Sequence, residues 1–355
     1  MFDSILERHL VESLKRAFEY LGHSVHSTDL IVHGHDMIKN ESDKKKVWSE
    51  IEKALDFTPD LFISFRPMNL LPEMVEVIKK KCITAIWLSD DPVLYKTCYS
   101  LVVDSYDLML HCGSEKIISF YHAKGHKHGI NFPFWTDHHA FPPVYNPLEA
   151  GEEVLFLGNM NGQVRRKRYF EFAKLPNKKK IFGLLDSDPL GIHGGFIKEA
   201  YLNCDLVSQT IKNFRISVSI PQFFDEYAGL HYDFPELRSL GYFQFPSRVI
   251  QYIASGIPVA AVGQEDMKFA MPEIEVSSSI NGLESYISKV ISDFDFAQSE
   301  SKKVLSRFRK SYSSLARAQH LLYILNNMEE IRSMSPGKKA TQFLEFESSY
   351  SEKTY

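Results

Sequence analysis

Short apolar segments alternate with helical patterns along most of this chain, and this alternation constrains the fold more than any other feature. The apolar segments lie at residues 60–65, 83–88, 108–111, 154–157, 181–185, 216–220, 258–262 and 273–276. Residues with helical spacing separate them, for example at 71–81 and 165–173. Strands that alternate with helices form parallel sheets with helices on their faces. The sequence therefore predicts an α/β protein.

The chain is long enough for two domains with separate cores, because it has 355 residues. Residues 131–151 are rich in proline and lack periodicity, which is typical of a domain boundary. We expect one domain over residues 1–145 and a second over residues 150–330. Residues 335–355 contain many Lys, Ser and Glu residues and are predicted to be a disordered tail. The chain opens with an amphipathic helix, so either a first strand is missing or another segment takes its place in the sheet.

Composition and charge exclude several classes of protein. The formal net charge of -4 argues against a dedicated nucleic-acid binder. The four cysteines show no CxxC spacing, so neither a zinc site nor a disulfide framework is expected, and a reducing compartment fits. Neither a signal-peptide pattern nor a membrane-spanning apolar run is present. We expect a cytoplasmic protein, with peripheral membrane contact left open.

Residues 245–261 carry the most informative local pattern, a loop followed by a helix, a glycine stop and a buried strand. Pro246 suits the first turn of the helix, which Ser247 and Arg248 open, and Gly256 suits a left-handed helix end. A helix N-terminus beside an arginine binds phosphate, because its free N–H groups and dipole favour an anion. An ordinary helix–strand junction would show the same pattern and is the alternative interpretation.

A second phosphate-binding pattern follows the predicted strand at 154–157. Gly158 and Asn159 come directly after the strand, and a glycine lets the backbone approach a diphosphate closely. Arg165 and Arg168 follow in the loop or first helical turn. The planar guanidinium group pairs with phosphate oxygens and stays charged. The alternative is that these arginines form a solvated helix face.

Five stretches of the chain, in order, resemble the CgeB-like (spore-maturation glycosyltransferase-like) family. They lie at residues 87–92 (Trp-Leu-Ser-Asp-Asp-Pro), 106–109, 132–142, 154–168 and 245–261. The resemblance implies a GT-B-like fold, in which two doubly wound parallel-sheet domains face each other across a cleft. It also implies transfer of a sugar from a nucleotide-diphosphate sugar to a glycan, surface-polysaccharide or lipid-linked saccharide acceptor, without an obligatory metal.

The resemblance also implies roles for particular residues. Those expected at the donor are Gly158, Asn159, Arg165, Arg168, Ser247, Arg248 and Gln251. Asp90 and Asp91 follow the predicted strand at 83–88 and are expected to act on the acceptor, one of them as a general base. The alternative for Asp91, which precedes Pro92, is capping of the next helix.

Two departures from the family keep other functions open. Gln251 stands where the family usually has a glutamate that accepts from ribose hydroxyls, and Phe243 stands where some members carry a second glutamate. With the missing first strand, these favour a non-catalytic GT-B-like binding or scaffold protein as the alternative. Asp186 and Asp188 form a D-x-D string, the metal-binding signature of the GT-A fold, which gives a metal-dependent GT-A transferase as a third interpretation. His122, His126 and His128 are interpreted as surface or cleft histidines without a metal.

Overall fold

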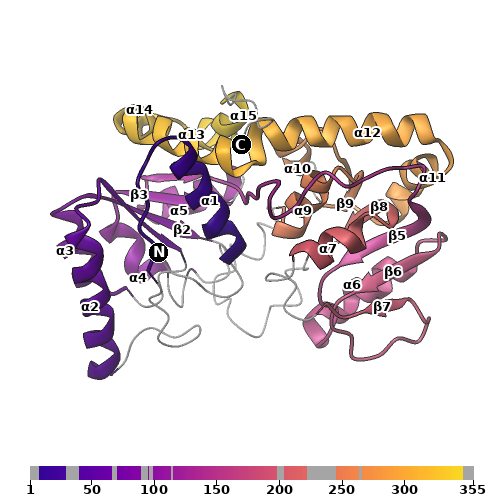
Figure 1. Cartoon of the computed structure of the whole chain (residues 1–355), viewed down its shortest axis with the longest axis horizontal. Coiled ribbons are helices and arrows are strands. Elements are labelled where there is room, and N and C mark those ends of the chain that lie inside the picture. Colours follow the sequence, from indigo (N-terminus) through magenta and orange to yellow (C-terminus); the bar gives the residue numbers. More distant parts are fainter. Residues whose placement is uncertain are drawn as a thin grey trace.

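The computed structural model describes residues 8–28, 40–65, 70–88, 95, 99–112, 115–197, 204–221, 245–263 and 266–346. These residues form two parallel β-sheets, each with helices packed beside it, in two halves that lie side by side (Figure 1). The predicted α/β class with parallel sheets is confirmed. No helix in the described ranges is both long enough and apolar enough to cross a bilayer.

The first sheet has four parallel strands in chain order, β1 (Leu61–Phe65), β2 (Ile83–Leu88), β3 (Leu108–His111) and β4 (Gly129–Asn131). Its helices are α1 (Arg8–Tyr20), α2 (Glu41–Asp56), α3 (Pro72–Lys79), α4 (Ser100–Val102) and α5 (Glu115–Ala123). The sequence predicted the first three strands. It did not indicate β4, which is short and begins with glycine. Within the described ranges no strand precedes β1, and residues 29–39 lie outside those ranges.

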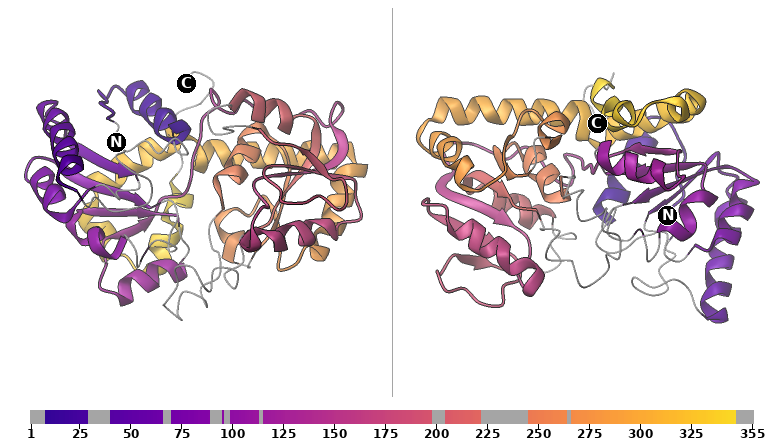
Figure 2. Two further views of the ribbon diagram at one scale, coloured as in Figure 1. Left: turned by 90° about the horizontal axis from the view of Figure 1, so that it is seen from below. Right: turned by 180° about the vertical axis from the view of Figure 1, so that it is seen from behind.

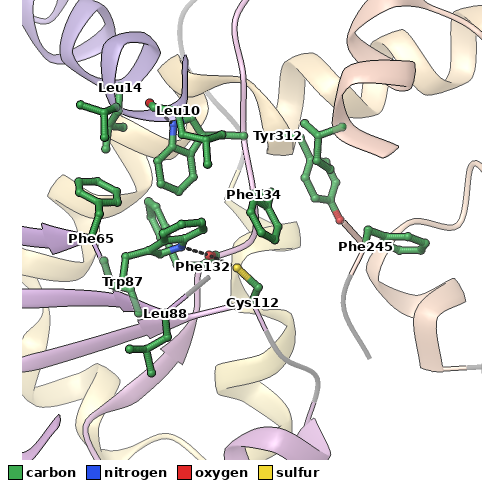
Figure 3. Packing of buried hydrophobic residues seen from close by; sticks show 14 of the residues in the cluster. Leu10, Leu14, Phe65, Trp87, Leu88, Cys112, Phe132, Phe134, Phe245 and Tyr312 are labelled. Carbon is green, nitrogen blue, oxygen red and sulfur yellow. Dashed lines mark hydrogen bonds between the residues drawn. The ribbon is translucent and has the colours of Figure 1, made fainter. Parts of the chain in front are cut away.

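An aromatic core ties this sheet to the segment that follows it. Phe65 on β1 packs against Trp87 on β2 (Figure 3). The ring of Trp135 lies 5.0 Å from that of Trp87 and also packs against Phe65. The Trp87 indole N–H donates to the carbonyl of Phe132 at 3.0 Å, and that of Trp135 donates to the carbonyl of Leu10 at 2.9 Å. Each buried indole therefore has a hydrogen-bond partner, and the segment after β4 is fixed to both β2 and α1.

The second sheet has six parallel strands in the order β10-β9-β8-β5-β6-β7. They are β5 (Gly151–Leu157), β6 (Lys179–Phe182), β7 (His193–Gly195), β8 (Phe214–Ser219), β9 (Val259–Val262) and β10 (Glu275–Ser277). The chain starts in the middle at β5, builds outward to β7, then returns to the other side of β5 as β8. This is the doubly wound order, and its direction of winding reverses between β5 and β8.

The helices of the second half begin with α6 (Gln163–Ala173), α7 (Cys204–Ile211), α9 (Ser247–Ser255) and α10 (Asp266–Ala270). They continue with α11 (Glu284–Ser292) and α12 (Phe294–Arg307), and a π-helical turn (Phe308–Tyr312) leads into α13 (Ser314–Asn326). Two more helices, α14 (Met328–Ser333) and α15 (Pro336–Glu345), end the described chain. The chain thereby returns to the first half, where α13 packs against α1, and α15 packs against α5 and β4 (Figure 1, Figure 2).

The predicted disordered tail over 335–355 is wrong for the residues of α15. Ser335 caps this helix by accepting from the N–H of Lys338, and Phe343 is buried. The Lys339 ammonium donates to the carbonyl of Lys127 at 2.6 Å, and the Gln342 amide donates to the carbonyl of Asn131 at 3.1 Å. The polar composition that indicated disorder therefore includes side chains that dock the helix on the first half. Residues 347–355 lie outside the described residues.

Candidate functional site

The carboxyl ends of β5 and β8 meet where the second sheet reverses its winding. In open parallel sheets, ligands bind outside the carboxyl ends of the strands at such a switch point. Gly158 and Asn159 follow β5 directly, and Ile220 and Pro221 follow β8. The topology therefore places the glycine pattern found in the sequence at the position where this class of sheet binds ligands.

The backbone conformation at position 158 and the side chains around it both favour glycine there. Its φ is +140°, which side chains other than glycine rarely adopt. A Cβ atom built there would lie 2.8 Å from Nη1 of Arg248 and 3.3 Å from the ring of Phe156. The structure therefore brings Arg248 against Gly158, although the two are far apart in the sequence.

Three contacts hold Arg248 at this position. Its guanidinium lies over the ring of Phe156, 5.0 Å from the ring centre, and Nη2 donates to the carbonyl of Ile220 at 3.2 Å. Its third neighbour is Gly158. Because Phe156 belongs to β5 and Ile220 follows β8, this arginine spans the switch point. A half-buried guanidinium held in this way presents a fixed positive charge to a ligand.

Tyr252 fixes the helix that carries Arg248. Its hydroxyl is buried and accepts from the N–H of Leu157, the last residue of β5, at 2.7 Å. Burial raises the pKa of this phenol above its ordinary value, so it remains neutral. Gly256 then ends α9 at a φ of +84°, as predicted from the sequence. No local sequence pattern indicates the roles of Tyr252 and Phe156, because both act through contacts between distant segments.

Replacing Tyr252 with phenylalanine is expected to lower the free energy of unfolding by about 1–3 kcal/mol. The change leaves the buried N–H of Leu157 without an acceptor while the ring stays in place. Urea unfolding of both proteins measures the effect. Tyr323→Phe removes a hydroxyl from a partly exposed ring and is the matched control, expected to stay within about 0.5 kcal/mol of wild type. Equal stability of Tyr252→Phe and wild type would contradict this role.

The helices α6 and α9 both begin without a side-chain cap. Gly162 and Pro246 occupy their N-cap positions and make no side-chain hydrogen bond there. In contrast, Asn40, Asp293 and Ser313 cap α2, α12 and α13. The first-turn N–H groups of a helix need an acceptor, and an anion supplies one. The helices α3, α11 and α14 also lack a side-chain cap, but α6 and α9 are the ones that follow β5 and β8, the strands that flank the switch point.

The other predicted donor residues divide into two groups. Arg168 is buried, and its Nε donates to the carbonyl of Pro221 at 3.1 Å, so it anchors α6 to the end of β8. Asn159 accepts from the N–H of Leu184 at 3.0 Å and ties the loop after β5 to the loop after β6. Arg165, Ser247 and Gln251 are half-buried in their helices.

Ser247 and Gln251 lie four residues apart on α9, so they share the face next to Arg248. Asp90, Asp91 and Phe243 lie outside the described residues. Their predicted roles rest on the sequence alone.

The D-x-D string forms local structure. The Asp188 carboxylate accepts from the N–H groups of Ile192 and His193 and from the hydroxyl of Tyr169, at 2.8–3.0 Å. Asp186 accepts from the N–H of Gly162 at 2.5 Å. These bonds close the turn between β6 and β7 and fix the start of α6. No group of three or more His, Cys, Asp or Glu side chains that could hold a metal occurs in the described ranges.

The histidines noted in the sequence have separate structural contacts. The ring of His126 pairs with Asp104 at 2.6 Å, and His128 contacts the carbonyl of Val103 at 2.9 Å. His122 lies beside the ammonium of Lys339. Burial lowers the pKa of both His122 and His128. These three rings therefore help to pack the first half together.

Comparisons with known proteins were made by sequence and by structure. No protein-family model matches the chain, and no curated protein matches it. Among solved structures, an α-glucosyltransferase in complex with UDP-glucose and DNA is similar at a TM-score of 0.58 and 13% identity, covering 90% of this chain and 95% of that one. HepE from Anabaena, in complex with UDP and glucose, is similar at a TM-score of 0.50 and 12% identity, covering 88% of both chains.

TarM is similar at a TM-score of 0.52 and 11% identity, covering 78% of this chain, which spans 57% of TarM. At these identities the likeness shows the fold alone. Together with the two parallel sheets, it shows that the chain has the GT-B fold, and the GT-A interpretation based on Asp186 and Asp188 is wrong.

Proposed function

We propose that this protein is a glycosyltransferase that takes a sugar from a nucleotide-diphosphate donor. Residues 150–330 form the donor-side domain in this proposal, and residues 1–145 form the acceptor-side domain. One observation carries the proposal: Arg248 lies against Gly158 at the switch point of the second sheet, in the first turn of an uncapped helix. This arrangement fits a diphosphate, because it combines a fixed cation, a helix N-terminus without a side-chain cap, and a glycine at the end of a strand.

The same groups supply the chemistry of sugar transfer. When the bond between sugar and diphosphate breaks, negative charge develops on the leaving phosphate oxygen. Arg248 and the N-terminus of α9 are already held in place by Phe156 and Tyr252, so they stabilise this charge without reorganising. Ser247 and Gln251 share the face of α9 next to Arg248, where Gln251 is proposed to contact the ribose. Arg165 is proposed as a second phosphate contact from α6.

A uridine nucleotide is the first donor to test. Two of the similar structures were solved with UDP-glucose or UDP. The acceptor is proposed to be a glycan, a surface polysaccharide or a lipid-linked saccharide, and Asp90 or Asp91 is proposed to deprotonate its hydroxyl group. These acceptor-side roles rest on the sequence pattern.

A thermal-shift screen with UDP, GDP, dTDP and CMP, each with magnesium or with EDTA, tests the proposal. A ligand that binds only the folded state raises the melting temperature. We expect one diphosphate to raise it equally in magnesium and in EDTA. No shift with any nucleotide would contradict the proposal. A shift without sugar transfer or donor hydrolysis would favour a non-catalytic nucleotide-sugar-binding protein with the same fold.

Replacing Arg248 with alanine is expected to weaken nucleotide binding by about 1.5–3 kcal/mol, because a hydrogen-bonded charge at the diphosphate is lost. Isothermal titration calorimetry with the nucleotide identified in the screen measures the change. Arg309→Ala removes an exposed arginine from the π-helical turn and is the matched control, expected to bind like wild type. If Arg248→Ala also binds like wild type, the diphosphate is not at this position.

A further inference from the structure

Two loops at the carboxyl ends of β5 and β6 lie directly against each other. We call residues 158–162, which follow β5, the donor loop, and residues 182–186, which begin at the end of β6, the supporting loop. Three hydrogen bonds of 2.8–3.0 Å join them, from the N–H of Gly158 to the carbonyl of Phe182, from the N–H of Met160 to the carbonyl of Leu184, and from the N–H of Leu184 to Oδ1 of Asn159. The pairing of β5 with β6 therefore continues beyond both strands and into the loops.

Gly183 makes the closest contact between the two loops. A Cβ atom built on Gly183 would lie 2.0 Å from the carbonyl oxygen of Gly158 and 3.1 Å from the backbone nitrogen of Asn159. Real Cβ atoms essentially never come within 3.0 Å of such an atom, and here the obstacle is backbone rather than a flexible side chain. Any side chain at position 183 would therefore push the donor loop away from its present position.

The strand β7 holds Gly183 from the other side. The N–H of Gly183 donates to the carbonyl of Gly195 at 3.0 Å, and the carbonyl of Gly183 accepts from Nε2 of His193 at 2.9 Å. Gly183 therefore lies between β7 and the donor loop, with both of its backbone polar groups bonded to β7. Because an alanine at this position could move outward only by breaking these bonds, the displacement would fall on the donor loop.

Asp186 holds the opposite end of the donor loop. Its carboxylate accepts from the N–H of Gly162 at 2.5 Å, and Gly162 is the N-cap residue of α6, with a φ of +74°. The supporting loop thus fixes the donor loop at both ends, through Gly183 at Gly158 and through Asp186 at Gly162. Asp186 is exposed, so its side chain can be changed without disturbing the core.

These contacts give the supporting loop a role in ligand binding as well as in closing a turn. Arg248 lies against Gly158, so a shift of the donor loop also changes the surroundings of the guanidinium that is proposed to bind the diphosphate. A displacement of about 1 Å in a preorganised site can cost about 100-fold. We propose that Gly183 and Asp186 are positioning residues, which set the nucleotide affinity of the donor site without touching the nucleotide. This inference rests on the proposed function.

Nucleotide affinity tests the inference, measured by calorimetry in EDTA with the nucleotide identified in the thermal-shift screen. Gly183→Ala is expected to lose at least about tenfold in affinity, because its Cβ displaces Gly158. Gly151→Ala is the matched control. It adds a Cβ 3.2 Å from the carbonyl oxygen of Asn213 at the other end of β5, and it is expected to bind like wild type. A residue that acts only on stability would leave the affinity of the folded protein unchanged.

Two variants of Asp186 test the second contact, whether or not Gly183→Ala folds. Asp186→Ala removes the acceptor of the Gly162 N–H and is expected to lose about threefold or more in affinity, equally in magnesium and in EDTA. Asp186→Asn keeps a carbonyl oxygen at this position and is expected to restore the wild-type affinity. This rescue separates positioning from metal binding, because a neutral amide lacks the charge with which a carboxylate binds a divalent metal.

The possible results distinguish this inference from the donor site itself. Wild-type affinity in both Gly183→Ala and Asp186→Ala would overturn the inference, whereas a loss in Arg248→Ala would still support the donor site. An equal loss in Gly151→Ala would also overturn it, since any strain in the second sheet would then have the same effect. Losses in both Asp186 variants with magnesium alone would identify a metal ligand instead. If wild type binds no nucleotide, the proposed function fails and this inference fails with it.

Discussion

Replacing Phe343 with alanine is expected to lower the free energy of unfolding by about 3–5 kcal/mol, the usual cost of removing a buried phenylalanine. Phe343 is 1% exposed on α15, near the C-terminal end of the described chain. Its ring lies 5.9 Å from that of Tyr312 and 5.3 Å from the buried guanidinium of Arg317. The helix α15 is therefore part of the core. If α15 detached, apolar surface of the first half would become exposed.

Urea or thermal unfolding of Phe343→Ala and wild type measures this effect. Phe269→Ala is the matched control, because Phe269 is 72% exposed on α10, and its stability is expected to stay within about 0.5 kcal/mol of wild type. If Phe343→Ala lowered the free energy of unfolding as little as Phe269→Ala does, α15 would not be docked on the first half. This result would then restore the prediction of a disordered tail.

Acidification from pH 7 to pH 5 is expected to destabilise the protein through buried neutral histidines. Burial lowers the pKa of His9 from 6.5 to about 4 and, together with nearby His122 and Lys339, lowers that of His111 to about 3. The unfolded chain therefore takes up protons below pH 6.5, whereas the folded chain does not, so stability falls as the pH falls through this window. Each of the two lowered pKa values is expected to reduce the free energy of unfolding by about 2 kcal/mol at pH 5.

A variant at His9 isolates its share of this loss. Neither ring nitrogen of His9 has a hydrogen-bond partner among the described residues, and the ring packs edge-on against Phe141. Phenylalanine at this position keeps the aromatic packing and removes the titrating group. Urea unfolding at pH 7 and pH 5 measures how much the free energy of unfolding falls between the two pH values. We expect this fall to be about 2 kcal/mol smaller for His9→Phe than for wild type. An unchanged difference between the two pH values would contradict a buried neutral His9.

Continuous apolar runs made β5 and β9 predictable from the sequence. Both strands are buried on both faces of a parallel sheet, so almost every residue in their central parts is apolar. β8 is buried as well, but its apolar residues alternate with Arg215, Ser217 and Ser219. β4 and β7 contain glycine and have only three residues each, so their pattern does not differ from that of a loop. α15 was missed for a related reason, because its buried Lys339 and Gln342 have the composition of an exposed helix.

The sequence predicted those residues of the candidate site that follow a local rule. Gly158 and Arg248 each follow a local rule, one at the end of a strand and one at the start of a helix, and parallel topology brings such ends to one edge. Phe156 and Tyr252 contribute through contacts with distant segments, which no local pattern indicates. The Asp186–Asp188 string shows the opposite case, since a pattern typical of metal sites serves here to close a turn.

A crystal structure of the protein with UDP tests the central claim most directly. We expect the diphosphate beside Gly158, in contact with the guanidinium of Arg248 and the first-turn N–H groups of α9, at the carboxyl ends of β5 and β8. UDP bound at any other position would contradict this placement. Crystals grown at saturating UDP that show no nucleotide in the second half of the chain would contradict the donor site itself.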